Sequence, residues 1–141
     1  MTGAAPPDYV AYHSAEAMGY PASAVRTLTI VTNKRVAPGA LGARVWLVAG
    51  EGRPRRYYLR GWFTVDTVES GADEGYRTRV HGTSGALFRP MRPIDGEPWF
   101  DDFRRSQGSF AFGFQRIADR RFVRALERAA ARAAARAGRG G

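Results

Sequence analysis

The stretch from Arg44 to Val68 constrains the fold most, because it carries two apolar and aromatic runs around a connector rich in glycine and proline. This pattern predicts a β-hairpin. Alternation along the second run divides its side chains between two faces. One face, expected to be core, holds Tyr57, Leu59, Gly61, Phe63, Val65 and Thr67. The other mixes aromatic with charged side chains and suits a concave binding surface; it holds Tyr58, Arg60, Trp62, Thr64, Asp66 and Val68.

Composition limits the possible classes of function. A length of 141 residues predicts one domain, and the absence of cysteine excludes disulfides and thiolate metal sites. No run of about 18 apolar residues and no signal-peptide pattern occurs, so we expect a cytoplasmic protein without a membrane partner. Phosphate-loop and dinucleotide fingerprints are missing, and His13 and His81 lack partners at metal-ligand spacing. We therefore expect neither a cofactor nor a metal.

The charge balance points to a polyanionic partner. The formal net charge is +9, which favours nucleic acid. Lys34 is the single lysine among 22 basic residues, which also fits the arginine bias of a GC-rich genome. The predicted phosphate contacts are Arg53, Arg55 and Arg56 in the connector and Arg120, Arg124 and Arg128 near the C-terminus. The last three belong to an i, i+4 row, and the alternative is a solvated face on an alanine-rich terminal helix.

The remaining pattern predicts an α+β fold. Glycines that interrupt strands, Gly61 and Gly113, indicate bulges or close backbone approach and favour a small, sharply bent mixed β-barrel. The predicted strands are Tyr9–Tyr12, Arg26–Thr32, Tyr76–Val80 and Ser109–Ile117, the last with Phe110, Phe112 and Phe114 on one face. The predicted helices are Ala15–Met18 after the cap Ser14, Trp99–Ser106, and Asp119–Ala137, which Asp119 caps and Gly138 ends. The last helix carries an apolar stripe that is expected to dock on the rest of the fold: Phe122, Val123, Leu126, Ala130 and Ala133. Pro90–Pro98 is expected to cross irregularly. We divide the chain into a lead-in (1–8), a barrel domain (9–117) and a basic helix with its tail (118–141).

Two interpretations of the hairpin's mixed face stay open. Trp62 and Tyr58 beside Arg60 and Asp66 would form a stacking pocket for a flipped base. Alternatively, Trp62 packs beneath the terminal helix as core. For the whole protein, two rivals to nucleic-acid binding stay open. One is a small metal-dependent nuclease or nucleotide-processing enzyme using Asp66 and Asp101, and the other is a protein-interaction subunit that docks through its terminal helix. Nothing marks the carboxylates as a catalytic set, so no catalytic residue is predicted and an enzyme is the weaker hypothesis.

Several strings resemble one family. These are TNK at Thr32–Lys34, GARVWLVAGEGRPRRYYL at Gly42–Leu59, WFDDF at Trp99–Phe103 and QGSFAFGFQRI at Gln107–Ile117. Together they resemble bacterial PUA-like modules of the EVE, SRA and ASCH groups, which occur alone or fused to HNH nucleases in restriction systems. The resemblance implies a barrel flanked by helices, with an aromatic cage that accepts a modified base extruded from DNA.

The resemblance also assigns residues. Asn33, Lys34, Trp62 and Trp99 would lie near the cage, and Gln107 to Ser109 near its rim. No HNH-type histidine and asparagine cluster follows the barrel. The resemblance therefore implies a DNA reader without the nuclease, with a nuclease or modification-system protein as its partner.

Overall fold

The computed structural model describes residues 6–32, 37–70, 78–111 and 113–140, without the side chains of 136–140. Asn33, Lys34 and Phe112, which the sequence analysis singles out, lie outside these ranges. The strands are β1 (Asp8–Ser14), β2 (Thr29–Thr32), β3 (Arg44–Glu51), β4 (Arg56–Thr64), β5 (Thr67–Ser70), β6 (Thr78–His81), β7 (Ser84–Pro93) and β8 (Phe114–Ile117). The α-helices are α1 (Ala15–Met18), α2 (Phe100–Ser106) and α3 (Arg120–Gly140), and the 3₁₀ turns are η1 (Ala22–Ala24), η2 (Ala37–Ala40) and η3 (Gly108–Phe110).

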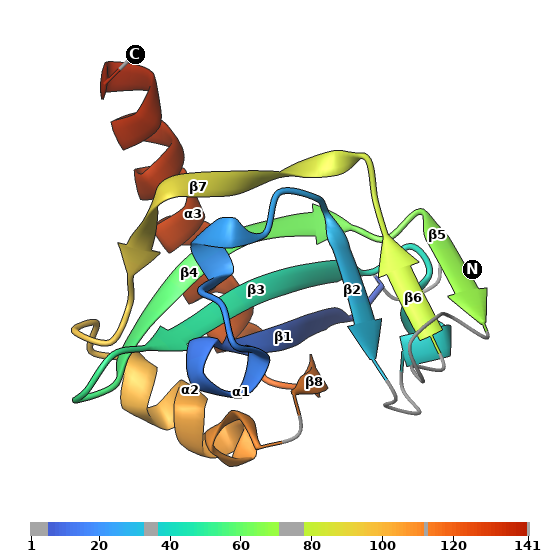
Figure 1. Ribbon diagram of the computed structural model, residues 1–141, viewed down its shortest axis with the longest axis horizontal. Helices are drawn as coiled ribbons and strands as arrows, with labels where there is room; N and C mark the ends of the chain where they lie inside the picture. Colours follow the sequence, from blue (N-terminus) through green and yellow to red (C-terminus); the bar gives the residue numbers. More distant parts are fainter. Residues whose placement is uncertain (1–5, 33–36, 71–77, 112, 141) are drawn as a thin grey trace.

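The described strands form two sheets. The larger has the order β7-β4-β3-β1-β8, and the smaller has the order β2-β6-β5. β1 and β3 are parallel, whereas the other neighbours in both sheets are antiparallel. Helices α2 and α3 lie behind the larger sheet, while α1, η1 and β2 lie in front of it (Figure 1). The α+β class is confirmed, and within the described ranges the strands do not close into one barrel.

Each face of the larger sheet has its own core. The core on the side of α2 and α3, here the helix-side cluster, includes Trp46, Val48, Leu59, Phe103, Phe110, Phe122 and Leu126. The core on the side of the smaller sheet, here the sheet-side cluster, includes Tyr9, Ala11, Val45, Leu47, Phe63, Val65, Val80 and Phe114. The larger sheet is therefore buried on both faces, which explains the nearly unbroken apolar run of β3.

A bulge at Arg60 changes which side chains of β4 share a face. Leu47 pairs with Gly61 and Val48 pairs with Leu59, so Arg60 is one extra residue in β4. As a result Leu59 and Trp62 both pack with the helix-side cluster, whereas Phe63 belongs to the sheet-side cluster. The prediction that strict alternation holds from Tyr57 to Val68 is therefore wrong, because the bulge moves every later side chain to the opposite face of the strand.

Glycine at position 61 allows β7 to approach β4 closely. A Cβ atom at Gly61 would lie 2.0 Å from the carbonyl oxygen of Ala86. This confirms the predicted close backbone approach at Gly61. The predicted irregular crossing over Pro90–Pro98 is wrong at its start, because β7 continues to Pro93, which pairs with Tyr58.

The segment Ser109–Ile117 is not one strand. Three successive residues, Gly108, Ser109 and Phe110, have positive φ angles of 58°, 56° and 63°, which turn the chain through η3 before β8 begins. Phe110 enters the helix-side cluster and Phe114 enters the sheet-side cluster. The prediction that these rings share one face is therefore wrong.

Other predicted elements shift in partner or length. β6 pairs with β5 and β2, and β2 covers only the second half of Arg26–Thr32. The α1 prediction is confirmed, since Ser14 Oγ accepts from the backbone N–H of Ala17 at 3.2 Å. Asp119 caps α3 through its Oδ1, which accepts from the Arg121 N–H at 2.9 Å. α3 then continues past Gly138.

The buried carboxylate of Asp8 joins three elements. Its Oδ2 accepts from Arg44 Nε at 2.7 Å and from Trp46 Nε1 at 2.8 Å, and its Oδ1 accepts from Arg120 Nη1 at 3.0 Å. β1 therefore begins at Asp8, at the end of the expected lead-in, and is tied to β3 and α3.

The predicted apolar stripe of α3 is buried on the sheet: Phe122, Val123, Leu126, Ala130 and Ala133. No helix in the described part of the chain is long and apolar enough to cross a membrane.

Candidate functional site

A cavity of about 620 Å³ lies in front of the larger sheet, beneath the segment that runs from α1 through η1 to β2. Its volume is within the range of roughly 300 to 1,000 Å³ that is typical of small-ligand pockets. The sheet contributes its floor through Ala11, Leu47, Val48, Arg60 and Phe114. The covering segment contributes Met18, Tyr20, Ala22, Ala24, Val25, Arg26, Thr27, Thr29, Ile30, Val31 and Thr32.

Aromatic rings occupy one end of the cavity. Tyr12, His13, Tyr20 and Phe114 all contribute to the lining. His13 Nε2 donates to the carbonyl oxygen of Tyr20 at 2.8 Å, and the two rings meet edge to face with centroids 5.0 Å apart. Tyr20 is 44% exposed and neighbouring Met18 is 42% exposed. Exposed apolar side chains at the edge of a cavity are typical of a surface that meets a ligand.

The cationic side chain of Arg60 lies in the cavity floor. It is 1% exposed and is the extra residue at the bulge of β4. Its Nη1 donates to the carbonyl oxygen of Phe88 at 2.7 Å. Its Nη2 donates to the carbonyl oxygens of Val25 at 2.6 Å and Ser23 at 3.3 Å. Arg60 therefore holds the covering segment against the sheet.

The charge of Arg60 is not neutralised by the residues that line the cavity. Burial lowers its pKa from the ordinary arginine value, and the nearby cations Arg89 and Arg26 lower it further. The described residues that line the cavity include Arg26 and Arg60 but no aspartate or glutamate. The Nε–H of Arg60 is buried and has no hydrogen-bond partner in the described part of the chain. This combination is unusual, since buried charges in proteins are normally paired.

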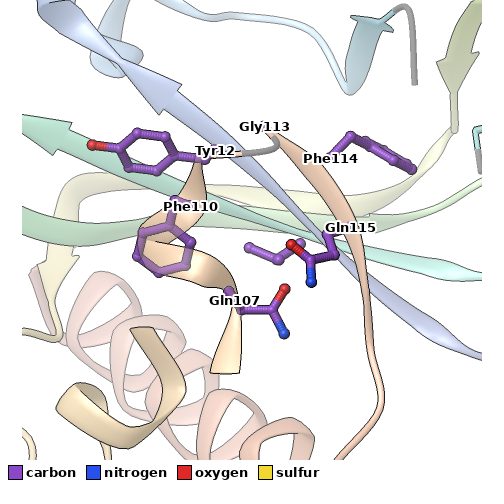
Figure 2. A pocket seen from close by; sticks show the side chains of 7 residues that line it. Tyr12, Gln107, Phe110, Gly113, Phe114 and Gln115 are labelled. Carbon is purple, nitrogen blue, oxygen red and sulfur yellow. The ribbon is translucent and has the colours of Figure 1, made fainter. Parts of the chain in front are cut away.

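A narrower crevice adjoins the cavity behind β1 and β8. Tyr12, Gly113 and Phe114 line both spaces. In Figure 2 the amide groups of Gln107 and Gln115 project into the crevice beside Phe110. The Oε1 atoms of both glutamines are buried without a hydrogen-bond partner among the described residues.

A second space of about 470 Å³ shares Gln107 and Gln115 with the crevice. This space is lined by Asp102, Ser106, Gln107, Gln115, Arg116, Ala118, Asp119, Arg121 and Phe122. Gln107 and Gln115 therefore separate the crevice from an open groove between α2 and the start of α3.

The predicted base-binding residues do not converge on one site. Arg60 lines the cavity, but Trp62 and Trp99 pack against the helix-side cluster on the opposite face of the sheet. Trp62 lies 6.3 Å from Trp46, measured between ring centroids, and Trp99 packs on Phe103 at 5.9 Å. Tyr58, half-buried, lies next to Tyr57 on the other face of β4, and Ser109 is exposed in η3.

The predicted phosphate contacts fall into two groups. Four of them are engaged in ion pairs: Arg53 and Arg55 with Glu16, Arg56 with Asp95, and Arg120 with Asp8. Arg124 and Arg128 are exposed on α3 and form no ion pair with any described residue. Arg55 also donates to the hydroxyl of Tyr12 at 3.4 Å, and Tyr12 contributes to the cavity lining.

Asp66 and Asp101 do not form a metal site. Asp101 follows Phe100, whose ring lies 5.0 Å from that of Tyr57 at the start of β4. Asp66 lies beyond the other end of this nine-residue strand, on the order of 25 Å away. Asp66 instead accepts from the backbone N–H and hydroxyl of Thr83 at 2.9 and 2.8 Å. Among the described residues no group of three potential metal ligands occurs. The pairing of Asp66 with Asp101 in a nuclease site is therefore wrong.

Sequence reasoning did not identify the segment that covers the cavity. Residues Tyr20 to Thr27 have no regular periodicity, so nothing in their order indicates that they cover a sheet. One signal was present. An arginine between apolar residues in a central strand needs either a bulge or a buried partner, and Arg60 has the bulge.

No protein-family model matches this chain, and neither a curated protein nor a solved structure matches it. The function is therefore inferred from the geometry and chemistry of the cavity.

Proposed function

We propose that this chain is a non-enzymatic nucleic-acid-binding module that accepts one unstacked nucleobase in the cavity under η1. The observation that carries the proposal is the cavity itself, which combines aromatic rings with a buried arginine that has no anionic partner among the described residues. Aromatic rings supply stacking surface for any base, and stacking contributes about 1 to 3 kcal/mol per base. Tyr20, which is 44% exposed, and neighbouring His13 are the candidate stacking residues. Tyr12 and Phe114 also line the cavity, but their rings already stack on Phe110 and Tyr9, respectively.

The arrangement of charge around the cavity supports the same proposal. Arg26 lines the cavity, and Arg53 and Arg55 lie next to α1 at its aromatic end. Their shared partner Glu16 is 62% exposed, so these ion pairs are weak and can exchange for phosphate contacts. Phosphate contacts would then position the strand, while the cavity reads the base.

The finer parts of the proposal rest on the resemblance to PUA-like modules. These parts are a barrel derived from the two sheets, DNA rather than RNA as the ligand, a modified base as the target, and a nuclease or modification-system protein as the partner. The site differs from the one that the resemblance implies, because the proposed stacking residues come from β1 and the α1–η1 connection. Trp62 and Trp99 instead support the sheet from the helix side.

Binding to a labelled oligonucleotide tests the proposal. We expect fluorescence anisotropy with a 12-nucleotide single strand to show affinity that falls steeply between 50 and 200 mM salt. Thr27→Trp places a large ring at an exposed position in the cavity lining and is expected to lower affinity about tenfold or more. Leu41→Trp is the matched control, since Leu41 is 63% exposed and lies outside the lining.

Two results would overturn the proposal. One is the absence of binding to any single-stranded or duplex probe. The other is equal affinity of the Thr27→Trp and Leu41→Trp variants, which would place nucleic acid elsewhere on the molecule.

A further inference from the structure

The floor of the cavity carries an uncompensated positive charge in a place that solvent barely reaches. Arg60 is 1% exposed, and its three hydrogen bonds go to neutral carbonyl oxygens of Phe88, Val25 and Ser23. Carbonyl oxygens satisfy N–H groups but do not cancel a formal charge. A desolvated guanidinium with no counterion is costly in free energy. A bound anionic ligand would supply the missing counterion.

The other charges close to Arg60 have the same sign. Arg26 contributes to the cavity lining, and Arg26 and Arg89 both disfavour the charged form of Arg60, as the lowered pKa of Arg60 reflects. The acidic residues nearest in the sequence to Arg26 and to Arg60, respectively, are engaged elsewhere. Glu16 pairs with Arg53 and Arg55, and Asp66 accepts from Thr67 and Thr83.

One hydrogen-bond donor on the same side chain has no partner in the described part of the chain. Of the guanidinium nitrogens, Nη1 and Nη2 are held by carbonyls, and the buried Nε has no partner among the described residues. An anionic oxygen that reaches Nε would meet an N–H donor and a positive charge together, the combination that gives the shorter and stronger charge-assisted hydrogen bonds.

From these observations we infer that the cavity selects a ligand that carries an anionic oxygen, recognised by Arg60 in the floor and Arg26 in the wall. This inference rests on the proposed function and adds the ligand's chemistry to it. Arg60 belongs to the sheet floor, so it meets the part of a ligand that enters deepest. For a nucleotide that enters base first, this part is the base, and its anionic oxygen would belong to an acidic substituent such as a carboxylate. For a strand that enters by its end, it would be a terminal phosphate.

The test compares ligands that differ in charge but not in shape. Three 12-nucleotide single strands carry cytosine, 5-carboxylcytosine or the uncharged 5-carboxamide at one central position. We expect the wild-type protein to bind the carboxylate strand about tenfold or more tightly than the carboxamide strand. A second pair of strands, with a 5′-phosphate or a 5′-hydroxyl, identifies the terminal phosphate as the source if only that pair shows the preference.

Variants then test whether the preference for the anionic strand arises in the cavity. Arg26→Gln and Arg60→Lys are expected to lower the ratio of anionic to neutral affinity by about threefold or more. Arg116→Gln removes the same charge from an exposed position outside the cavity and should leave the ratio unchanged. Because the ratio is first measured in the wild-type protein, a variant that fails to fold does not remove the test.

The possible failures are distinguishable. If no strand binds, the proposed function fails together with the inference. If all strands bind with the expected salt dependence but anionic and neutral ligands bind equally, the inference alone is overturned. A preference that survives in Arg26→Gln and in folded Arg60→Lys would also overturn it, because the anion would then be read elsewhere.

Discussion

The Nη2 atom of Arg60 lies 2.6 Å from the carbonyl oxygen of Val25, so an internal strand of the larger sheet holds the segment that covers the cavity. This contact joins β4 to a stretch of chain that has little regular structure of its own. It depends on the bulge that turns Arg60 toward the front of the sheet. The shape of the cavity and the position of its positive charge therefore have the same origin.

Removing this contact is expected to loosen the covering segment. Arg60→Met keeps an unbranched side chain but leaves the carbonyls of Val25 and Phe88 without their donor, at a cost of about 1 to 3 kcal/mol. Urea unfolding measures the loss, and hydrogen exchange should show faster exchange at residues 22–28. Arg105→Met, at an exposed position on α2, is the control and should stay within about 0.5 kcal/mol of the wild type. Unchanged hydrogen exchange at residues 22–28 would contradict the conclusion that Arg60 holds the covering segment.

The buried carboxylate of Asp8 is expected to be important for stability. Asp8→Asn removes the negative charge that faces Arg44 and Arg120, and we expect a loss of about 2 to 4 kcal/mol in the free energy of unfolding. The matched control is Asp102→Asn, which breaks an exposed pair with Arg105 and should change stability by less than about 1 kcal/mol. Equal effects of the two variants would contradict a structural role for Asp8.

The ion pair of Asp95 makes stability depend on acidic pH. Hydrogen bonds from Arg56 at 2.6 and 3.1 Å, with one from the backbone N–H of Tyr57, hold the pKa of Asp95 below its ordinary value of 3.8. Since the folded pKa is the lower one, the stabilisation is complete above about pH 5 and is lost as the pH falls through 3.8 and below.

Asp95→Asn is therefore expected to be less stable than the wild type near neutral pH. The two proteins should converge as the pH falls below the lowered pKa of Asp95, where this carboxyl of the wild type is protonated. Thermal unfolding followed across this pH range is the measurement. A stability difference that stays constant with pH would show that charge is not the cause.

The close contact of β4 with β7 predicts strong intolerance at Gly61. The added methyl of Gly61→Ala would meet the carbonyl oxygen of Ala86 at 2.0 Å, and this oxygen belongs to the paired backbone of β7. We expect a loss of about 3 kcal/mol or more, because two strands must separate. Gly96→Ala is the control, since a methyl there meets nothing within 4 Å. The measurement is the denaturant midpoint of each variant. Similar midpoints for Gly61→Ala and Gly96→Ala would contradict the close contact of β4 with β7.

The sequence predicted the elements whose signals are local. Ser14 and Asp119 were identified as caps from residue type alone, and the stripe from Phe122 to Ala133 predicted the buried face of α3. The hairpin of β3 and β4 was predicted by its apolar runs and its glycine-containing connector. These features depend on hydrogen bonds and periodicities that span only a few residues.

The remaining features depend on long-range contacts. The bulge at Arg60 is defined by how β3 and β7 pair with β4, and it moved Trp62 to the helix side. The positive φ angles at Ser109 and Phe110 broke a strand whose alternation looked regular. The cavity was not visible because residues far apart in the sequence, such as Tyr20 and Phe114, form it together.

The central claim is that nucleic acid enters the cavity under η1 and not the arginine face of α3. The most direct measurement is a backbone amide chemical-shift titration of the full-length protein with the 12-nucleotide strand. We expect the largest shifts at residues that line the cavity: Tyr12, Tyr20, Val25, Arg60 and Phe114. Shifts confined to the surface around Arg124 and Arg128, with none at the cavity, would contradict it.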